Sequence, residues 1–297
     1  MKIIVAHSSP DLDAITSVWL LRKFLSGWEN AEVRFVSAGD RIAPFDHTKT
    51  DGAVEHIGEN EVIHVDTGLG PLDHHQTNDE AVCAASLTWD YVRERISGGE
   101  KWEEKQEALS RLVKVVVDID HFKEVFWPDP TADHYEFSLF GILEGLKMQR
   151  PDEDDYYVTF ISECLDALLH NFENRVWAEK ELKEKGKEFQ SRYGKGIGFE
   201  SVNDTVLKLA QKMGYAIAVR KDPRKGYVRI KAKPALGVQP KDIDLTLVYE
   251  KLSKMDPDAT WFLHVSKKML LNGTTKNPKM RPTRLSLDDI IRVLENV

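Results

Sequence analysis

Short apolar runs alternate with helical patterns over the first 120 residues of the chain. Three runs have the length and composition of buried strands, namely Lys2–Ala6, Glu32–Ser37 and Val62–Val65. From Ala14 to Leu25 the apolar residues recur at helical spacing. Strands that alternate with helices predict an α/β fold with a mostly parallel, doubly wound sheet.

The pattern changes twice further along the chain. From Asp120 to about Tyr193 it is helical throughout, and after Trp177 it becomes densely charged, which is typical of a solvated helix that links two domains. Beyond residue 196, the alternating segments Tyr215–Arg220 and Tyr227–Lys233 flank a turn and predict a β-hairpin. We therefore predict three segments: an α/β domain at residues 1–122, a helical connector at 123–195 and a smaller α+β domain at 196–297.

Charge is distributed unevenly between these segments. Residues 196–297 hold 19 Lys and Arg against 11 Asp and Glu, a net charge of +8, whereas the first 195 residues carry a net charge of −16. A basic region attracts polyanions, and an acidic region repels them unless metal ions are bound in it. The alternative for the basic region is that its lysines only solvate surface helices.

The remaining composition indicates a soluble protein of the cytoplasm. Only two cysteines occur, Cys83 and Cys164, so a disulfide framework is not expected. The first residues lead directly into a strand without a cleavable apolar segment, and no apolar run has the length needed to span a bilayer.

Candidate chemistry lies where the predicted strands end. Asp11 and Asp13 follow the first strand, after His7, and straddle the first turn of a helix. They could serve two neighbouring metal ions, or they could only complement the helix N-terminus. Asp66 ends the third strand, and its two oxygens could bridge two cations or cap the following turn.

A second group of polar residues lies within ten residues of Asp66. Because two adjacent imidazoles cannot both face one metal from a regular element, one of His74 and His75 is predicted to be a ligand. The other is free to contact substrate or developing charge on a phosphoryl oxygen. A further apolar run ends in Asp118 and Asp120, one of which is predicted to face the second metal, and spacing does not choose between them.

Oxygen-rich ligands with a few histidines suit two divalent ions, Mn²⁺ in preference or Mg²⁺, better than structural zinc. Two such ions about 3.5–4 Å apart activate a bridging water and neutralise charge on a phosphate oxygen. The predicted chemistry is therefore hydrolysis at phosphorus without a covalent intermediate.

The ordered set of residues resembles the Asp-His-His (DHH) phosphoesterase superfamily, which contains RecJ-type nucleases, oligoribonucleases, cyclic dinucleotide phosphodiesterases and family II pyrophosphatases. The resemblance covers about the first 120 residues. It implies that His75 contacts the scissile phosphate and that Asp73 orients a ligand imidazole. It also implies one metal bound by His7, Asp11 and Asp66, and another bound by Asp13, Asp66, His74 and the aspartate at 118 or 120.

The run Asp73-His-His-Gln76 also resembles the melanocyte-proliferating-gene family of DHH-like exonucleases, in which Asp-His-His-Gln is usual. That family's Asp-Asn-Gly element has no full counterpart, but Asp120-His121 occupies a comparable place and favours Asp120. The C-terminal segment lacks the Gly-Gly-His signature of many DHH enzymes. Instead, polar residues around a turn either bind a phosphate or nucleotide or form a surface hairpin: His264, Ser266, Lys267, Lys268, Asn272, Gly273 and Arg281.

These observations predict a phosphodiesterase that acts on nucleic acid ends or short oligonucleotides. One alternative is an enzyme of nucleotides or pyrophosphate, and another is a binding protein that keeps the metal residues without turnover. The expected partner is a phosphorylated substrate and not a membrane. The sequence leaves open the exact substrate, the cleavage polarity, the physiological metal and whether the chain forms a homodimer.

Overall fold

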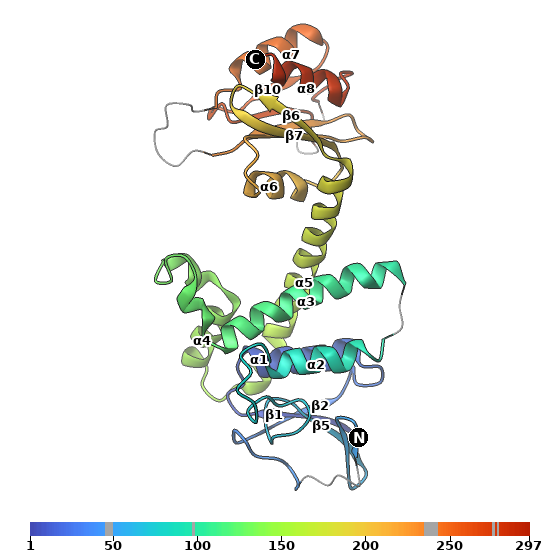
Figure 1. Cartoon of the computed structure of the whole chain (residues 1–297), viewed down its shortest axis with the longest axis vertical. Helices are drawn as coiled ribbons and strands as arrows, with labels where there is room; N and C mark the ends of the chain where they lie inside the picture. The colour runs from blue at the N-terminus through green and yellow to red at the C-terminus, as the bar shows by residue number, and fades with distance from the viewer. Residues whose placement is uncertain (45–49, 97–98, 235–242, 275–276, 278) are drawn as a thin grey trace. The chain divides into compact units, whose positions relative to one another are not determined.

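The computed structural model describes residues 1–44, 50–96, 99–234, 243–274, 277 and 279–297. They form two compact units, Met1–Glu173 and Asn174–Val297, and each unit has its own sheet (Figure 1). The predicted α/β class is confirmed, and the finer division at residues 122 and 195 stays a prediction. None of the helices described combines the length and apolar character that crossing a membrane requires.

The sheet of the first unit has the strand order β2-β1-β5-β4-β3. The three predicted strands are present as β1 (Lys2–His7), β2 (Glu32–Val36) and β5 (Asn60–His64), and β1 is parallel to both of its neighbours. Two short strands, β3 (Thr50–Asp51) and β4 (Val54–Ile57), extend the sheet in antiparallel fashion. The sheet is therefore mixed, and the prediction of a mostly parallel, doubly wound sheet is not confirmed.

Helix α1 (Leu12–Phe24) lies at the centre of the first unit, since every residue from Leu12 to Leu21 is buried. A helix that is buried on all sides packs against other elements around its whole circumference. Its partners include α2 (Ala84–Arg93) and α3 (Glu100–Asp120). The chain then continues through short 3₁₀ helices, η2 (Lys123–Phe126) and η3 (Asp133–Phe137), and through α4 (Leu139–Gln149).

Helix α5 (Asp154–Lys185) contributes residues to both units. The prediction of helix up to Tyr193 is wrong, because β6 (Lys187–Ser191) begins after Gly186. A Cβ atom at Gly186 would lie 2.4 Å from the Leu182 carbonyl oxygen, so this position of close approach requires glycine. The sequence around β6 is densely charged like that of α5, and within β6 only Phe189 and Ser191 are buried.

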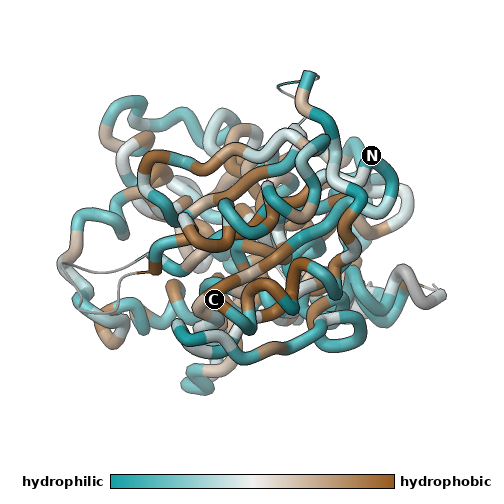
Figure 2. The backbone as a smooth tube through the Cα atoms, turned by 90° about the horizontal axis from the view of Figure 1, so that it is seen from above, coloured by the Kyte–Doolittle hydropathy of each residue, from teal (hydrophilic) through white to brown (hydrophobic). Residues whose placement is uncertain are grey.

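The sheet of the second unit has the order β10-β11-β9-β8-β7-β6, and only the β7–β8 pair is parallel. The predicted hairpin is confirmed as the antiparallel pair β8–β9. Apolar residues of α7 and α8 pack with buried residues of this sheet, and hydrophobic and hydrophilic positions alternate near the C-terminus in Figure 2. The remaining elements are β7 (Gly194–Glu200), α6 (Thr205–Lys212), β8 (Ile217–Lys221), β9 (Val228–Ala232), α7 (Thr246–Met255), β10 (Trp261–Leu263), β11 (Met269–Asn272) and α8 (Leu287–Glu295).

Asn272, at the end of β11, forms hydrogen bonds with the segment that leads to α8. Its side chain is fully buried, and its amide nitrogen donates to the carbonyl oxygens of Thr260 and Arg281, each at 3.0 Å. Its side-chain oxygen accepts a hydrogen bond from Thr283 N at 2.7 Å. One amide group thus bonds to three backbone groups on two segments, and the bond to Thr283 N is buried.

We predict that Asn272→Ala lowers the free energy of unfolding by about 2–4 kcal/mol, because it removes three hydrogen bonds and leaves the buried Thr283 N–H without its Asn272 acceptor. Urea unfolding followed by circular dichroism measures this change. The control is Val265→Ala on the neighbouring turn, where the side chain is 89% exposed and the expected change is within about 0.5 kcal/mol. Equal unfolding midpoints for the two variants would contradict the role given to Asn272.

Candidate metal centre

The ends of two parallel strands bring His7 and Asp66 together. Val65 N donates to Val5 O at 2.8 Å, so the residue after β5 lies beside the end of β1. His7 Nε2 is 3.2 Å from Asp66 Oδ2 and 4.0 Å from Asp11 Oδ1. Asp11 is also the N-cap of α1, where its side chain accepts from Ala14 N at 3.0 Å. Helix capping and membership of the site are therefore compatible at Asp11.

Asp66 adopts an unusual backbone conformation, with φ of +53° in the left-handed region. Aspartate tolerates this conformation better than most residues, at a cost of roughly 1–2 kcal/mol. Asp66 N donates to Leu72 O at 3.0 Å, which closes the loop of residues 66–72 that leads to the two histidines. The strained residue is thus held between β5 and that loop, as is common at functional sites.

A second set of ligand atoms surrounds His74. Its Nε2 atom is 3.6 Å from Asp66 Oδ1 and 3.6 Å from Asp120 Oδ2. Asp13 Oδ2 lies 3.7 Å from the same nitrogen. The two oxygens of Asp66 therefore face different groups, Oδ2 toward His7 and Oδ1 toward His74.

Two carboxylate oxygens at the centre of this arrangement are buried without a hydrogen-bond partner, Asp66 Oδ1 and Asp120 Oδ2. Burying such an atom unpaired costs free energy, and a bound cation would remove that cost. Oxygen and imidazole donors together fit Mn²⁺ or Mg²⁺. Among the described residues, the groups with ligand atoms close enough to share an ion are His7–Asp11–Asp66, Asp66–His74–His75 and His74–Asp120–His121.

Hydrogen bonds from the first residues of helix α2 hold the side chain of Asp13 in place. The residue is almost completely buried, and its two oxygens accept from Ala84 N at 2.8 Å and Ala85 N at 2.6 Å. These amides open α2, so Asp13 on α1 caps the start of a second helix. The fold therefore fixes the position of this carboxylate.

The two candidate aspartates near residue 120 lie in different surroundings. They end helix α3 and not a strand, which corrects the prediction that each site residue follows a strand. Residues two apart on a helix do not share a face. Asp118 consequently points away and pairs with Lys114, whereas Asp120 joins His74 in the cluster. The geometry favours Asp120 as the ligand.

Asp73 and His75 form a separate pair at the edge of the site. His75 Nδ1 donates to Asp73 Oδ1 at 2.7 Å, and the side chain of His75 is 58% exposed. Asp73 is buried and also accepts from Leu69 N at 2.6 Å and from His75 N at 3.1 Å. The resemblance implied that Asp73 orients a ligand imidazole, and in the structure the imidazole that it holds is His75.

The pKa values reflect a concentration of negative charge. Burial opposes protonation of His7, but its hydrogen bonds to Asp66 and to the Ser8 carbonyl, together with the charges of Asp11 and Asp66, outweigh burial and raise the pKa of His7 to about 9. The interaction with Asp66 likewise raises the pKa of His74 to about 9. Burial, and then the charge of Asp66, raise the pKa of Asp13. The carboxylates therefore favour positive charge in their midst.

Sequence reasoning missed two groups of residues around this centre. His121 Nε2 donates to Val82 O at 2.8 Å, while the ring stays within reach of Asp120. Arg41 donates to the carbonyl oxygen of Gly68 at 2.6 Å and pairs with buried Glu55, so it braces the loop after Asp66. No local pattern signals either role, since both depend on contacts across the fold.

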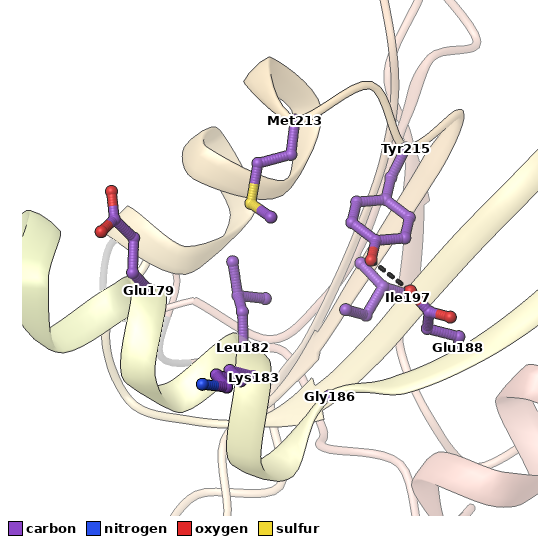
Figure 3. Close-up of a pocket in the computed structure, with 8 residues that line it drawn as sticks. All are labelled: Glu179, Leu182, Lys183, Gly186, Glu188, Ile197, Met213 and Tyr215. Carbon is purple, nitrogen blue, oxygen red and sulfur yellow. Dashed lines mark hydrogen bonds between the residues drawn. The ribbon is translucent and has the colours of Figure 1, made fainter.

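A pocket of about 410 Å³ opens over the centre, and its lining includes His7, Asp66, His75 and Asp120. A larger pocket of about 620 Å³ lies in the second unit, between the end of α5 and Tyr215 (Figure 3). There the Tyr215 hydroxyl donates to Glu188, which also pairs with Lys195 at 2.7 Å. These polar groups satisfy one another, so we place the candidate chemistry at the smaller pocket.

The residues of the C-terminal segment that were predicted to bind substrate lie in different surroundings. Asn272 is committed to the fold, and Gly273 has φ of +78° with no room for a Cβ atom beside Tyr227. Asn272 holds neighbouring backbone segments together, and Gly273 allows a backbone conformation that other residues rarely adopt. The prediction that they bind a ligand is therefore corrected. On the β10–β11 turn, His264 Nδ1 is 2.8 Å from Ser266 Oγ, and Lys267 Nζ is 3.0 Å from Asp244.

Comparison with protein-family models and with curated proteins finds no match. Among solved structures, a pGpG-specific phosphodiesterase, PggH of Vibrio cholerae, has 17% identity and a TM-score of 0.31 over 93% of each chain. An uncharacterized protein of Helicobacter pylori G27 has 12% identity and a TM-score of 0.28, and a "putative family II inorganic pyrophosphatase" of Methanococcus jannaschii has 14% and 0.20, each over 99% of both chains. Similarities this low carry no inference, so the function proposed below rests on the geometry of the site.

We predict that Asp120→Asn weakens binding of one Mn²⁺ ion by about 100-fold or more, since loss of a ligand exceeds the effect of losing an outer-sphere partner. The matched control is Asp118→Asn, which makes the same chemical change two residues away and should keep both ions. Equilibrium dialysis with metal analysis measures the stoichiometry. Loss of an ion in Asp118→Asn but not in Asp120→Asn would overturn the assignment.

Proposed function

We propose that this chain is a two-metal-dependent phosphoesterase, with Mn²⁺ as the preferred ion. The supporting observation is the carboxylate of Asp66, whose two oxygens face separate groups: Oδ2 lies 3.2 Å from His7, and Oδ1 lies 3.6 Å from His74 Nε2, which is itself 3.6 Å from Asp120. A carboxylate shared in this way can bridge two ions. When bound, two ions would activate a water and neutralise charge on phosphate oxygens.

The chain's own residues divide the remaining tasks. Asp73 holds His75 through Nδ1, so Nε2 of this exposed ring would be the atom that contacts substrate. His75 would contact a phosphoryl oxygen on which charge develops during the reaction. Buried Asp13 and Asp66 fix the ligand set, since both are held by backbone amides or strained backbone. Pre-organised ligands of this kind reduce reorganisation during the reaction.

We propose phosphodiester bonds at nucleic acid ends or in short oligonucleotides as the substrate. The net charge of +8 in residues 196–297 supports a polyanionic partner. Within that region we retain His264, Ser266, Lys267, Lys268 and Arg281 as the proposed phosphate-binding group. Lys267 would exchange its partner Asp244 for a phosphate oxygen.

A panel of substrates tests this proposal. We predict that purified protein with Mn²⁺ shortens a labelled oligonucleotide and cleaves a dinucleotide, and that a chelator stops both reactions. Thin-layer or gel separation of the products measures cleavage. Turnover of pyrophosphate alone would favour a small-molecule phosphohydrolase, and no product despite bound metal would contradict an enzymatic role.

We predict that His75→Ala keeps both Mn²⁺ ions but lowers kcat by about 10²–10³-fold, because it removes a group that stabilises transition-state charge. His56→Ala is the control, since His56 is exposed on β4 and lies outside the site. Stopped-flow or steady-state rates, read together with metal content, separate the two effects. Normal turnover in His75→Ala would exclude this residue from catalysis.

A further inference from the structure

A second pocket adjoins the candidate metal centre. It has a volume of about 310 Å³, and Asp11 and Asp120 line both this pocket and the one over the centre. We call it the α3–α4 pocket, after the helices that form much of it. Its remaining walls are largely apolar, from Leu12, Val116, Ile119, Phe140 and Leu143, with Asp13, Glu124 and Glu144 adding carboxylates.

Glu124 reaches this pocket through a sharp turn in the backbone. Phe122, which follows the end of α3, has φ of +52°, a costly conformation for an aromatic residue. The turn leads into η2, which carries Glu124 back against α3. The strained backbone at Phe122 thus places the carboxylate of Glu124 in the wall of the pocket.

The carboxylate of Glu124 lacks an internal partner at one of its oxygens. Oε2 is buried and accepts no hydrogen bond. Glu144, by contrast, is 62% exposed and lies 3.4 Å from Lys147, so it belongs to the rim. Because an unpaired buried oxygen costs free energy, Glu124 is suited to a ligand that brings N–H donors into the pocket.

The lining favours a flat ligand with hydrogen-bond donors at its edge. The carboxylates disfavour phosphate in this pocket, and the apolar wall of Leu12, Val116 and Phe140 suits an apolar face better than a small hydrated cation. A nucleobase meets both conditions, since its faces pack on apolar and aromatic side chains and its edge carries N–H groups. Guanine presents two adjacent donors, N1–H and the N2 amino group, which match the two oxygens of one carboxylate.

We propose that the α3–α4 pocket holds a guanine base of the substrate, with Glu124 accepting from its N1–H and N2–H groups. This inference rests on the proposed function, because the phosphate attached to that nucleotide would lie at the metal centre. The shared residues Asp11 and Asp120 make the two pockets contiguous. A base pocket beside the centre distinguishes a nucleotide substrate from pyrophosphate.

Nucleoside binding tests the pocket without turnover. Guanosine and adenosine are titrated by calorimetry into the metal-free full-length protein, and we expect guanosine to bind at least about tenfold more tightly. Glu124→Gln should reverse this preference, because an amide offers one acceptor and one donor, which match the adenine edge and not the guanine edge. Glu136→Gln, the same change at an exposed residue of η3 that does not line the pocket, should keep the guanosine preference.

Phe140→Ala provides a second variant, which should weaken both nucleosides by removing an aromatic face from the wall. Equal binding of guanosine and adenosine by the unmodified protein would overturn the inference. So would a Glu124→Gln variant that folds, by circular dichroism, and keeps the guanosine preference.

Hydrolysis of dinucleotides with Mn²⁺ separates this inference from the proposed function. Faster cleavage of the guanine dinucleotide than of the adenine dinucleotide supports both. Equal cleavage of the two overturns the guanine pocket and leaves the phosphoesterase standing. Guanosine-selective binding without cleavage of either supports the pocket and overturns the enzymatic proposal.

Discussion

The buried carboxylate of Asp66 is the constraint around which the first unit is arranged. Parallel pairing of β1 and β5 brings it beside His7, and its left-handed backbone turns the chain toward His74. Both imidazoles approach the same side chain, one at each oxygen. A shift of either strand by one residue would move these groups to opposite faces of the sheet.

The carboxylate of Asp66 lies among other buried carboxylates, and the protein's own groups do not neutralise all of this negative charge. Burial, and then the charge of Asp66, raise the pKa of Asp11 and of Asp13. Burial, with the charges of Asp11 and Asp66, also raises the pKa of Asp120. The protein partly offsets this negative charge with hydrogen bonds, as at Asp13, whose oxygens cap α2. Two oxygens are left without donors, and divalent cations are the counter-charge that suits them.

Much of the fold could be predicted from the sequence where the periodic signal is strong. Strands β1, β2 and β5 are bounded apolar runs, and the β8–β9 hairpin alternates cleanly around its turn. The short strands β3 and β4 were not predicted because two and four residues are too few to show a clear alternation. Strand β6 was not predicted because its charged composition continues that of α5. The end of α5 depends on one close contact at Gly186.

The candidate site shows the same division between local and tertiary information. The residues at the ends of β1 and β5 were predictable, because parallel strands end at one sheet edge. Spacing did not separate Asp118 from Asp120, since the choice depends on which face of α3 meets His74. Arg41 and Glu124 were not predicted at all, because a bracing contact or a pocket wall leaves no periodic pattern in the sequence.

The central claim is that Asp66 bridges two metal ions. Anomalous diffraction from crystals grown with Mn²⁺ tests it most directly, since it locates each ion independently of activity. We predict two peaks about 3.5–4 Å apart, one beside His7 and Asp11 and the other beside His74 and Asp120, with Asp66 between them. A single peak, or two peaks that do not share Asp66, would contradict the account.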